Sequence, residues 1–178
     1  MPHPPPIPEQ TPSPGGAATL RLAAVQMVFA GSIPANLARI EKAAIRAARR
    51  GADAILFPEC ATTGYAFDFG TLTPAVLDPA LRALSALAGR LRVNLLVGSP
   101  VFRGPRLHNA LLVFDRTGRL VHTYAKCQLT PSDRRWFTPG EDISRFDLDG
   151  VPAGAFICHE RRYPELARIP VMAGARIL

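Results

Sequence analysis

Three residues of different chemistry, Glu59, Lys126 and Cys158, each follow a segment that favours a β-strand. The segments cover residues 54–58, 119–124 and 151–157. Ligands of α/β proteins bind beyond the carboxyl ends of strands, so residues in these positions are candidates for one shared site. A carboxylate, an amine and a thiol can act together as general base, oxyanion stabiliser and nucleophile. The combination therefore indicates nucleophilic catalysis.

Each of these residues also has a more ordinary interpretation when it is taken alone. A carboxylate after a strand is usually a surface residue or a helix cap, and a single lysine is usually solvated. A cysteine at a strand end is more often a small core residue than a nucleophile. Lys126 is nevertheless unusual, because only two of the 21 basic residues, Lys42 and Lys126, are lysines. A compact ammonium and a planar guanidinium are not interchangeable, so a lysine at this position can indicate that a compact ammonium is required there.

Several short motifs surround the three residues in a fixed order. They are Phe57-Pro58-Glu59, Gly64-Tyr65, Tyr124-Ala125-Lys126, Trp136-Phe137-Thr138-Pro139-Gly140 and the segment ICHERRYPEL over residues 157–166. From about residue 21 to the end, this arrangement resembles the nitrilase (carbon–nitrogen hydrolase) superfamily. The resemblance implies an α-β-β-α sandwich, a catalytic set of Glu59, Lys126 and Cys158, and no cofactor.

Further site residues are expected from the same resemblance. The family usually carries a second glutamate in the loop after the lysine, and Asp133, one methylene shorter, stands there. It commonly has aspartate two residues after the cysteine, where this chain has Glu160. The expected supporting residues are Asp133, His159, Glu160 and Arg162, and the expected substrate pocket includes Tyr65, Phe67 and Trp136.

The chemistry implied is hydrolysis of an amide, N-carbamoyl or nitrile substrate through a cysteine thioester. Glu59 would take the thiol proton as Cys158 attacks, while Lys126 and the backbone N–H of His159 hold the oxyanion. The lysine charge is also expected to favour the thiolate. The alternative is a catalytically silent fragment or a binding module that retains the family motif.

The elements that must position these residues alternate along the chain. Strands are predicted over residues 20–27, 54–58 and 93–98, and helices over 34–50 and 79–90. Two hairpins follow, 108–115 with 119–124 and 145–148 with 151–157, the second turning at Asp149-Gly150. A helix over 163–173 and a strand over 175–178 end the chain. The class is α/β with mixed sheets and helices outside.

The boundaries of the domain follow from composition and from the resemblance. Residues 1–19 hold seven prolines and no aromatic residue, which predicts a disordered tail. The carbon–nitrogen hydrolase domain is expected over residues 20–178, as the N-terminal two-thirds of the usual family length and incomplete at its C-terminus. Uncovered apolar faces and strand edges favour association, so a homo-oligomer or an aggregation-prone chain is predicted.

Composition limits the remaining possibilities. The 178 residues are 48% apolar and 20% charged, which fits one globular domain. No run of 18 apolar residues and no secretory signal pattern occurs, so we expect no membrane partner and a cytoplasmic protein. Three cysteines without Cys-x-x-Cys spacing favour free thiols over disulfides.

The net charge of +7 does not by itself predict a nucleic-acid partner. The basic residues are scattered singly or in pairs, which is typical of a solvated surface. His159 and Glu160 begin like a zinc-binding HExxH motif, but Tyr163 replaces its second histidine, so no metal is expected. The expected partner is a small-molecule amide, carbamoyl or nitrile substrate.

Overall fold

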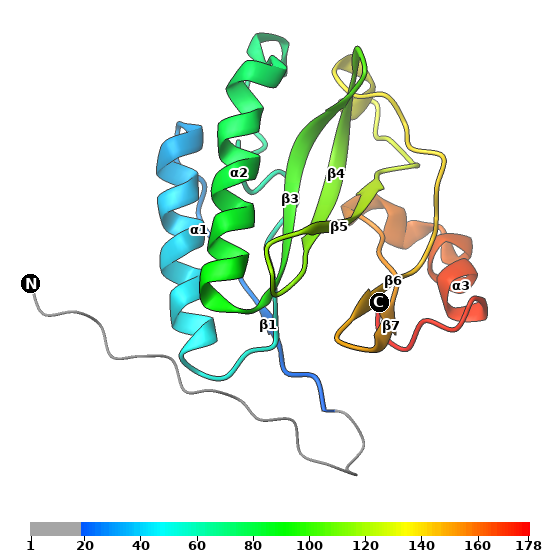
Figure 1. Cartoon of the computed structure of the whole chain (residues 1–178). Coiled ribbons are helices and arrows are strands. Elements are labelled where there is room, and N and C mark those ends of the chain that lie inside the picture. Colours follow the sequence, from blue (N-terminus) through cyan, green and yellow to red (C-terminus); the bar gives the residue numbers. More distant parts are fainter. Residues whose placement is uncertain (1–18) are drawn as a thin grey trace, which may run out of the picture.

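A computed structural model of the chain describes residues 19–178 (Figure 1). The predicted proline-rich tail, residues 1–19, falls outside the described residues except for its last position. No helix among the described residues is both long and apolar enough to cross a membrane.

The larger sheet has five strands in the spatial order β1-β2-β3-β4-β5. They are β1 (Leu22–Ala24), β2 (Ala54–Leu56), β3 (Asn94–Arg103), β4 (Arg106–Phe114) and β5 (Leu120–Ala125). The first three strands run parallel, whereas β3, β4 and β5 pair antiparallel. The two parallel connections are made by α1 (Ile33–Ala48) and α2 (Pro74–Leu91). The mixed sheet expected from the sequence is therefore confirmed.

Both long helices begin with a hydroxyl cap followed by a proline. Ser32 caps α1 and Thr73 caps α2, each side chain accepting a hydrogen bond from a backbone N–H three residues later. Proline suits the first turn because its missing N–H would be unpaired there anyway. The helix predicted from Pro79 in fact begins at Pro74, because Thr73 supplies the cap, and Pro79 lies inside it.

A second, two-stranded sheet consists of β6 (Phe146–Leu148) and β7 (Val151–Ala153). Asp149 and Gly150 form the predicted turn with positive φ angles of 54° and 84°. β7 is shorter than expected, since residues 154–157 leave the hairpin and lead to the short 3₁₀ helix η3 (Cys158–Arg162). The chain then forms α3 (Pro164–Met172) and returns to β7 through one parallel bridge between Ala153 and Ile177. This single bridge stands in place of the strand predicted over residues 175–178.

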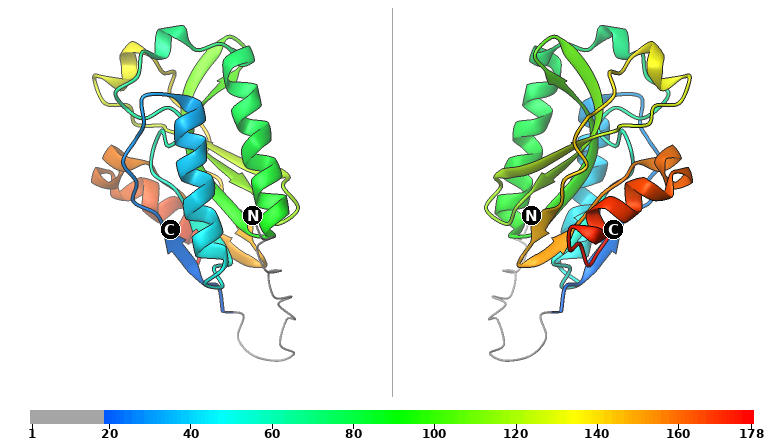
Figure 2. Two further views of the ribbon diagram at one scale, coloured as in Figure 1. Left: turned by 90° about the vertical axis from the view of Figure 1, so that its left-hand side faces the viewer. Right: turned by 90° about the vertical axis from the view of Figure 1, so that its right-hand side faces the viewer.

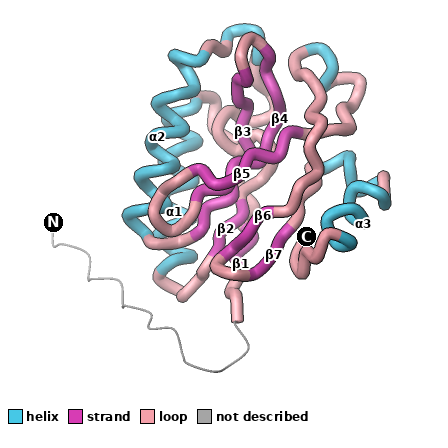
Figure 3. Tube along the Cα trace, turned by 45° about the vertical axis from the view of Figure 1, so that its right-hand side comes forward, coloured by secondary structure: helices cyan, strands magenta, loops and turns pink. Residues whose placement is uncertain are grey.

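The elements form layers with the larger sheet in the middle. α1 and α2 cover one face, and the β6–β7 hairpin with α3 lies on the opposite side (Figures 1 and 2). The hairpin runs in front of the larger sheet in Figure 3. This order confirms the predicted α-β-β-α arrangement of an α/β sandwich.

Two of the apolar clusters among the described residues join the layers. One joins the helices to the sheet through residues such as Ile40, Leu84 and Ile55, all almost fully buried. The other joins the opposite face of the sheet to the hairpin, with Leu96 packed in the same cluster as Phe146. The ends of β2 and β5 and the start of η3 are thereby brought to one region.

Candidate active site

Glu59 lies just beyond β2, where the chain crosses closely over β3. A Cβ atom on Gly98 of β3 would lie 2.2 Å from the Pro58 carbonyl oxygen and 2.6 Å from the Glu59 Cα. Only glycine therefore fits beneath this segment. The close approach places the Glu59 side chain in the site with 15% of it exposed.

Lys126 follows β5 and its side chain is completely buried. A similar close contact supports it from behind, because a Cβ atom on Gly140 would lie 2.2 Å from the Ala125 carbonyl oxygen. The Gly140 N–H donates to the Lys126 carbonyl at 2.9 Å. The Trp-Phe-Thr-Pro-Gly motif thus ends against the backbone of the lysine.

The Lys126 ammonium contacts two carboxylates. Its Nζ donates to Glu59 Oε1 at 2.6 Å and to Asp133 Oδ2 at 2.9 Å. Burial would lower the pKa of Lys126, but the hydrogen bonds and charges of the two carboxylates outweigh it and raise the pKa above 10.5. The lysine therefore stays positively charged in a place closed to water.

Asp133 opens the short helix η2 (Asp133–Arg135) and is 1% exposed. Its Oδ2 also accepts the Thr130 N–H at 2.9 Å, and its Oδ1 accepts a hydrogen bond from the Tyr65 hydroxyl. Burial would raise the pKa of Asp133, but the bonds from Tyr65 and Lys126 bring it below 3.8. The shorter side chain thus still reaches the lysine, and the tyrosine expected in the pocket holds its other oxygen.

Cys158 begins η3 with a left-handed backbone, φ 51°. The residue is exposed, while its partly buried thiol lies beside Glu59. Partial burial, then the charge of Glu59 and the hydrogen bond to it, raise the pKa of the thiol above 9.0, against smaller lowering effects of Lys126 and the His159 N–H. The lysine therefore acts in the predicted direction but is outweighed, so the resting Cys158 thiol is neutral.

Glu160 links two turns. The lysine turn is residues 126–128, directly after β5, and the cysteine turn is residues 157–158, at the start of η3. One carboxylate oxygen, Oε1, accepts the Cys127 N–H at 2.7 Å and the Gln128 N–H at 3.0 Å, and the other accepts the Ile157 N–H at 2.6 Å. The Tyr124 hydroxyl lies 2.9 Å from both oxygens. This fully buried glutamate therefore fixes the position of η3 relative to β5.

The other predicted site residues lie farther from this cluster. Arg162 is exposed, and its side chain forms no hydrogen bond or ion pair with any described residue. The His159 ring contacts the Tyr163 hydroxyl at 3.4 Å, so only its backbone N–H faces the thiol. Phe67 and Trp136 both pack on Phe69.

An apolar cavity of about 430 Å³ lies between the two sheets. Glu59 and Cys158 line it together with apolar residues of β1, β2 and the β6–β7 hairpin. None of Tyr65, Phe67 and Trp136 lines this cavity. A substrate pocket that includes those three residues stays a prediction.

One residue of the site, Asn109, was missed from the sequence. It is fully buried in β4 and its Nδ2 donates to Glu59 Oε1 at 2.7 Å. The only signal for it was an amide inside an apolar run, which has many ordinary explanations.

Comparison with known proteins identifies the family to which this chain belongs. The carbon–nitrogen hydrolase family profile matches residues 21–178. The chain therefore belongs to the carbon–nitrogen hydrolase family.

Individual relatives agree with this assignment. An amidase from Nesterenkonia sp. superposes with a TM-score of 0.83 at 26% identity, covering 89% of this chain and 63% of that one. The omega-amidase of Danio rerio is 30% identical over 169 residues, or 89% of this chain and 61% of its own length. A probable nitrilase of Schizosaccharomyces pombe is 30% identical over 132 residues, covering 70% of this chain and 48% of the relative. The chain thus spans less than two thirds of each of these relatives.

Proposed function

We propose that the protein hydrolyses non-peptide carbon–nitrogen bonds, with a small amide as the substrate, through a thioester on Cys158. The observation that carries this proposal is the contact of one buried ammonium with two carboxylates, Glu59 and Asp133, next to a thiol on a left-handed turn. A general base, a fixed cation and a nucleophile are the groups that acyl transfer requires.

The steps follow from the positions of these groups. Glu59 takes the thiol proton as Cys158 Sγ bonds to the amide carbon, because the resting thiol is neutral. Lys126 and the His159 N–H stabilise the oxyanion, a contribution of about 3–4 kcal/mol for a well-placed donor. Glu59 returns the proton to the departing nitrogen as the C–N bond breaks. Water deprotonated by Glu59 then cleaves the thioester and restores the thiol.

The relatives favour an amide over a nitrile or an N-carbamoyl compound. Among them are omega-amidases and a 2-oxoglutaramate amidase of Bacillus subtilis. A mutant of the Nesterenkonia amidase shows Michael addition of acrylamide at its active site cysteine. An unsaturated amide is therefore a suitable probe for the thiol of this chain.

The test combines turnover with covalent labelling. The chain is incubated with small aliphatic amides, N-carbamoyl amino acids and nitriles, and with acrylamide followed by peptide mass spectrometry. We expect hydrolysis of amides and acrylamide addition at Cys158, and loss of both in Cys158→Ala. The matched variant Cys127→Ala should retain both. Addition at Cys127 that persists in Cys158→Ala would overturn the assignment.

The setting of this activity is also part of the proposal. All three cysteines carry free thiols, which supports a reducing cytoplasmic location.

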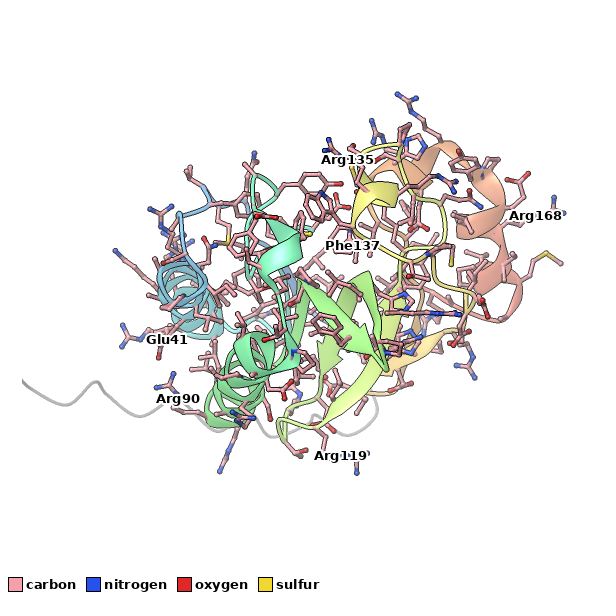
Figure 4. The ribbon with its side chains drawn as sticks, turned by 90° about the horizontal axis from the view of Figure 1, so that it is seen from above. Glu41, Arg90, Arg119, Arg135, Phe137 and Arg168 are labelled. Carbon is pink, nitrogen blue, oxygen red and sulfur yellow. The ribbon has the colours of Figure 1, made fainter. Side chains whose placement is uncertain are left out.

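The arginines labelled in Figure 4 come from separate elements, α2, the β4–β5 turn, η2 and α3, and Arg90 is paired with Glu41. This spread of the positive charges over the surface supports a small molecule, rather than a nucleic acid, as the partner.

A further inference from the structure

Asn109 is connected to both Glu59 and Lys126. It lies in β4 opposite Pro100 of β3, and none of its surface is exposed. Its backbone carbonyl accepts the Lys126 N–H at 2.8 Å, while its side-chain amide reaches Glu59. One residue of the sheet therefore contacts both the proposed base and the residue that carries the proposed oxyanion donor.

The chemistry of its neighbours fixes the orientation of the Asn109 amide. An ionised carboxylate only accepts hydrogen bonds, so the NH₂ group must face Glu59 Oε1, at 2.7 Å. The amide oxygen then faces the buried Cys60 thiol, which donates to it at 3.7 Å. Burial raises the pKa of Cys60 well above 9.0, so this thiol keeps the proton that it donates.

The two oxygens of Glu59 consequently differ. Oε1 accepts hydrogen bonds from both Asn109 Nδ2 and Lys126 Nζ, at 2.7 and 2.6 Å. Oε2 accepts no N–H or O–H hydrogen bond from any described residue. Two donors on one oxygen hold the carboxylate in a single orientation and leave the other oxygen free for proton transfer.

We propose that Asn109 is a positioning residue that holds the Glu59 carboxylate in one orientation and presents its Oε2 to the Cys158 thiol. This inference rests on the proposed function, in which Glu59 is the base. It assigns to a neutral amide in β4 a task that neither the motifs nor the catalytic set includes. Several other titratable groups face Glu59 and stay unchanged in the test below: Lys126, Asp133, Cys60, Tyr65 and Cys158.

The test detects the Asn109 hydrogen bond through the change that its loss causes in the titration of the Glu59 carboxyl. The chain contains six glutamates, so ¹³C labelling of their carboxyl carbons gives a tractable NMR titration, with the Glu59 signal assigned by its absence in Glu59→Gln. Asn109→Leu removes the donor at similar size, and Asn109→Asp replaces it with a second carboxylate. Asn94→Leu is the matched control, because Asn94 is a buried β3 asparagine that bonds Asp53 and Asp149 instead.

We expect the titration midpoint of Glu59 to rise by about one pH unit or more in Asn109→Leu, because a hydrogen bond to the charged form is lost. It should rise further in Asn109→Asp through repulsion between carboxylates. Asn94→Leu should leave the midpoint unchanged. The acidic limb of kcat/KM should move upward by the same amount as the midpoint.

The outcomes separate the two proposals. A wild-type midpoint in a folded Asn109 variant would overturn the positioning role, as would loss of cooperative folding in both Asn109 variants, which would make the residue structural only. If the wild-type chain hydrolyses none of the substrates, the proposed function fails, while the NMR titration still decides whether Asn109 controls Glu59.

Discussion

Lys126 combines full burial with a positive charge, and each of its two carboxylate partners lies within 2.9 Å of Nζ. A buried cation of this kind is stable only while both its charge and its geometry are satisfied. The site therefore depends on the size of the cationic group as well as on its sign.

Lys126→Arg should for this reason fail to support hydrolysis although it conserves the charge. The planar guanidinium is larger and directs its N–H groups differently, so it displaces Glu59 or Asp133. We expect kcat to fall by roughly 10²-fold or more, as on loss of an oxyanion donor. Steady-state kinetics checks this, with Lys42→Arg on α1 as the control, and a near-normal kcat would show that Lys126 is not part of the site.

Glu59→Gln should separate thiol ionisation from turnover. The pKa of Cys158 is raised by partial burial and then by the Glu59 charge, so removing that charge lowers the thiol pKa. The midpoint of iodoacetamide alkylation at Cys158 should therefore move to lower pH, while hydrolysis is lost with the base. Rates measured by mass spectrometry from pH 6 to about pH 10 test this. The exposed α3 variant Glu165→Gln should behave as wild type, and an unchanged midpoint in Glu59→Gln would contradict the electrostatic account.

The residue types of the site were predictable because each one follows a recognisable motif. The structure brings Glu59, Lys126 and Asp133 into direct contact and places Cys158 beside them. Asn109 was not predictable, because it lies 50 positions from Glu59 along the chain and no local motif surrounds it. The contact between Asn109 and Glu59 depends on the pairing of β4 with β3, which the residue types alone do not indicate.

At the scale of elements, the site depends on how η3 is attached to the end of β5. Glu160 makes this attachment with both carboxylate oxygens, on three backbone N–H groups and one hydroxyl. Charge-assisted hydrogen bonds of this kind are about twice as strong as neutral ones. The cysteine turn and the lysine turn are therefore held together as one unit.

Glu160→Gln should loosen this unit. A glutamine directs an NH₂ group at backbone N–H donors, which leaves buried groups unpaired at a cost of about 1–3 kcal/mol each. We expect a melting temperature several degrees lower and faster hydrogen exchange at the Cys127, Gln128 and Ile157 amides. Exchange measured by NMR tests this against Glu165→Gln, and unchanged protection of all three amides would show that Glu160 does not join the two turns.

The types of the helices and strands were predicted more accurately than the residues at which they begin and end. The hairpin turn at Asp149-Gly150 was found because its residue types determine its backbone. The predicted start of α2, at Pro79, was five positions too late. Pro74 and Pro79 both suit the first turn of a helix, and the cap supplied by Thr73 places the start at Pro74. β7 was predicted too long, because an apolar run continues where strand pairing ends.

At the scale of the whole molecule, the layer with β6, β7 and α3 leaves apolar surface open. α3 exposes Ile169, Val171 and Met172, and Leu22 of β1 is also exposed. The cavity between the two sheets is lined largely by apolar side chains. Patches of this kind favour association.

The 178-residue chain should therefore self-associate. Burying the exposed residues of α3 and β1 against a second copy removes apolar surface from water, worth about 25 cal/mol per Å². Sedimentation velocity at several concentrations should show species larger than the 19.2 kDa monomer. Met172→Lys should weaken association more than the control Lys42→Glu on α1, and a concentration-independent monomer with cooperative melting would contradict the prediction.

The left-handed backbone at Cys158 also restricts how the site could evolve. At φ 51° a β-branched side chain is strongly disfavoured, whereas cysteine, serine and alanine fit more easily. Threonine is therefore a poor replacement on backbone grounds, before its chemistry is considered. An exchange of the proposed sulfur nucleophile for an oxygen one is therefore easier through serine, and a change to threonine would require the turn into η3 to be rebuilt first.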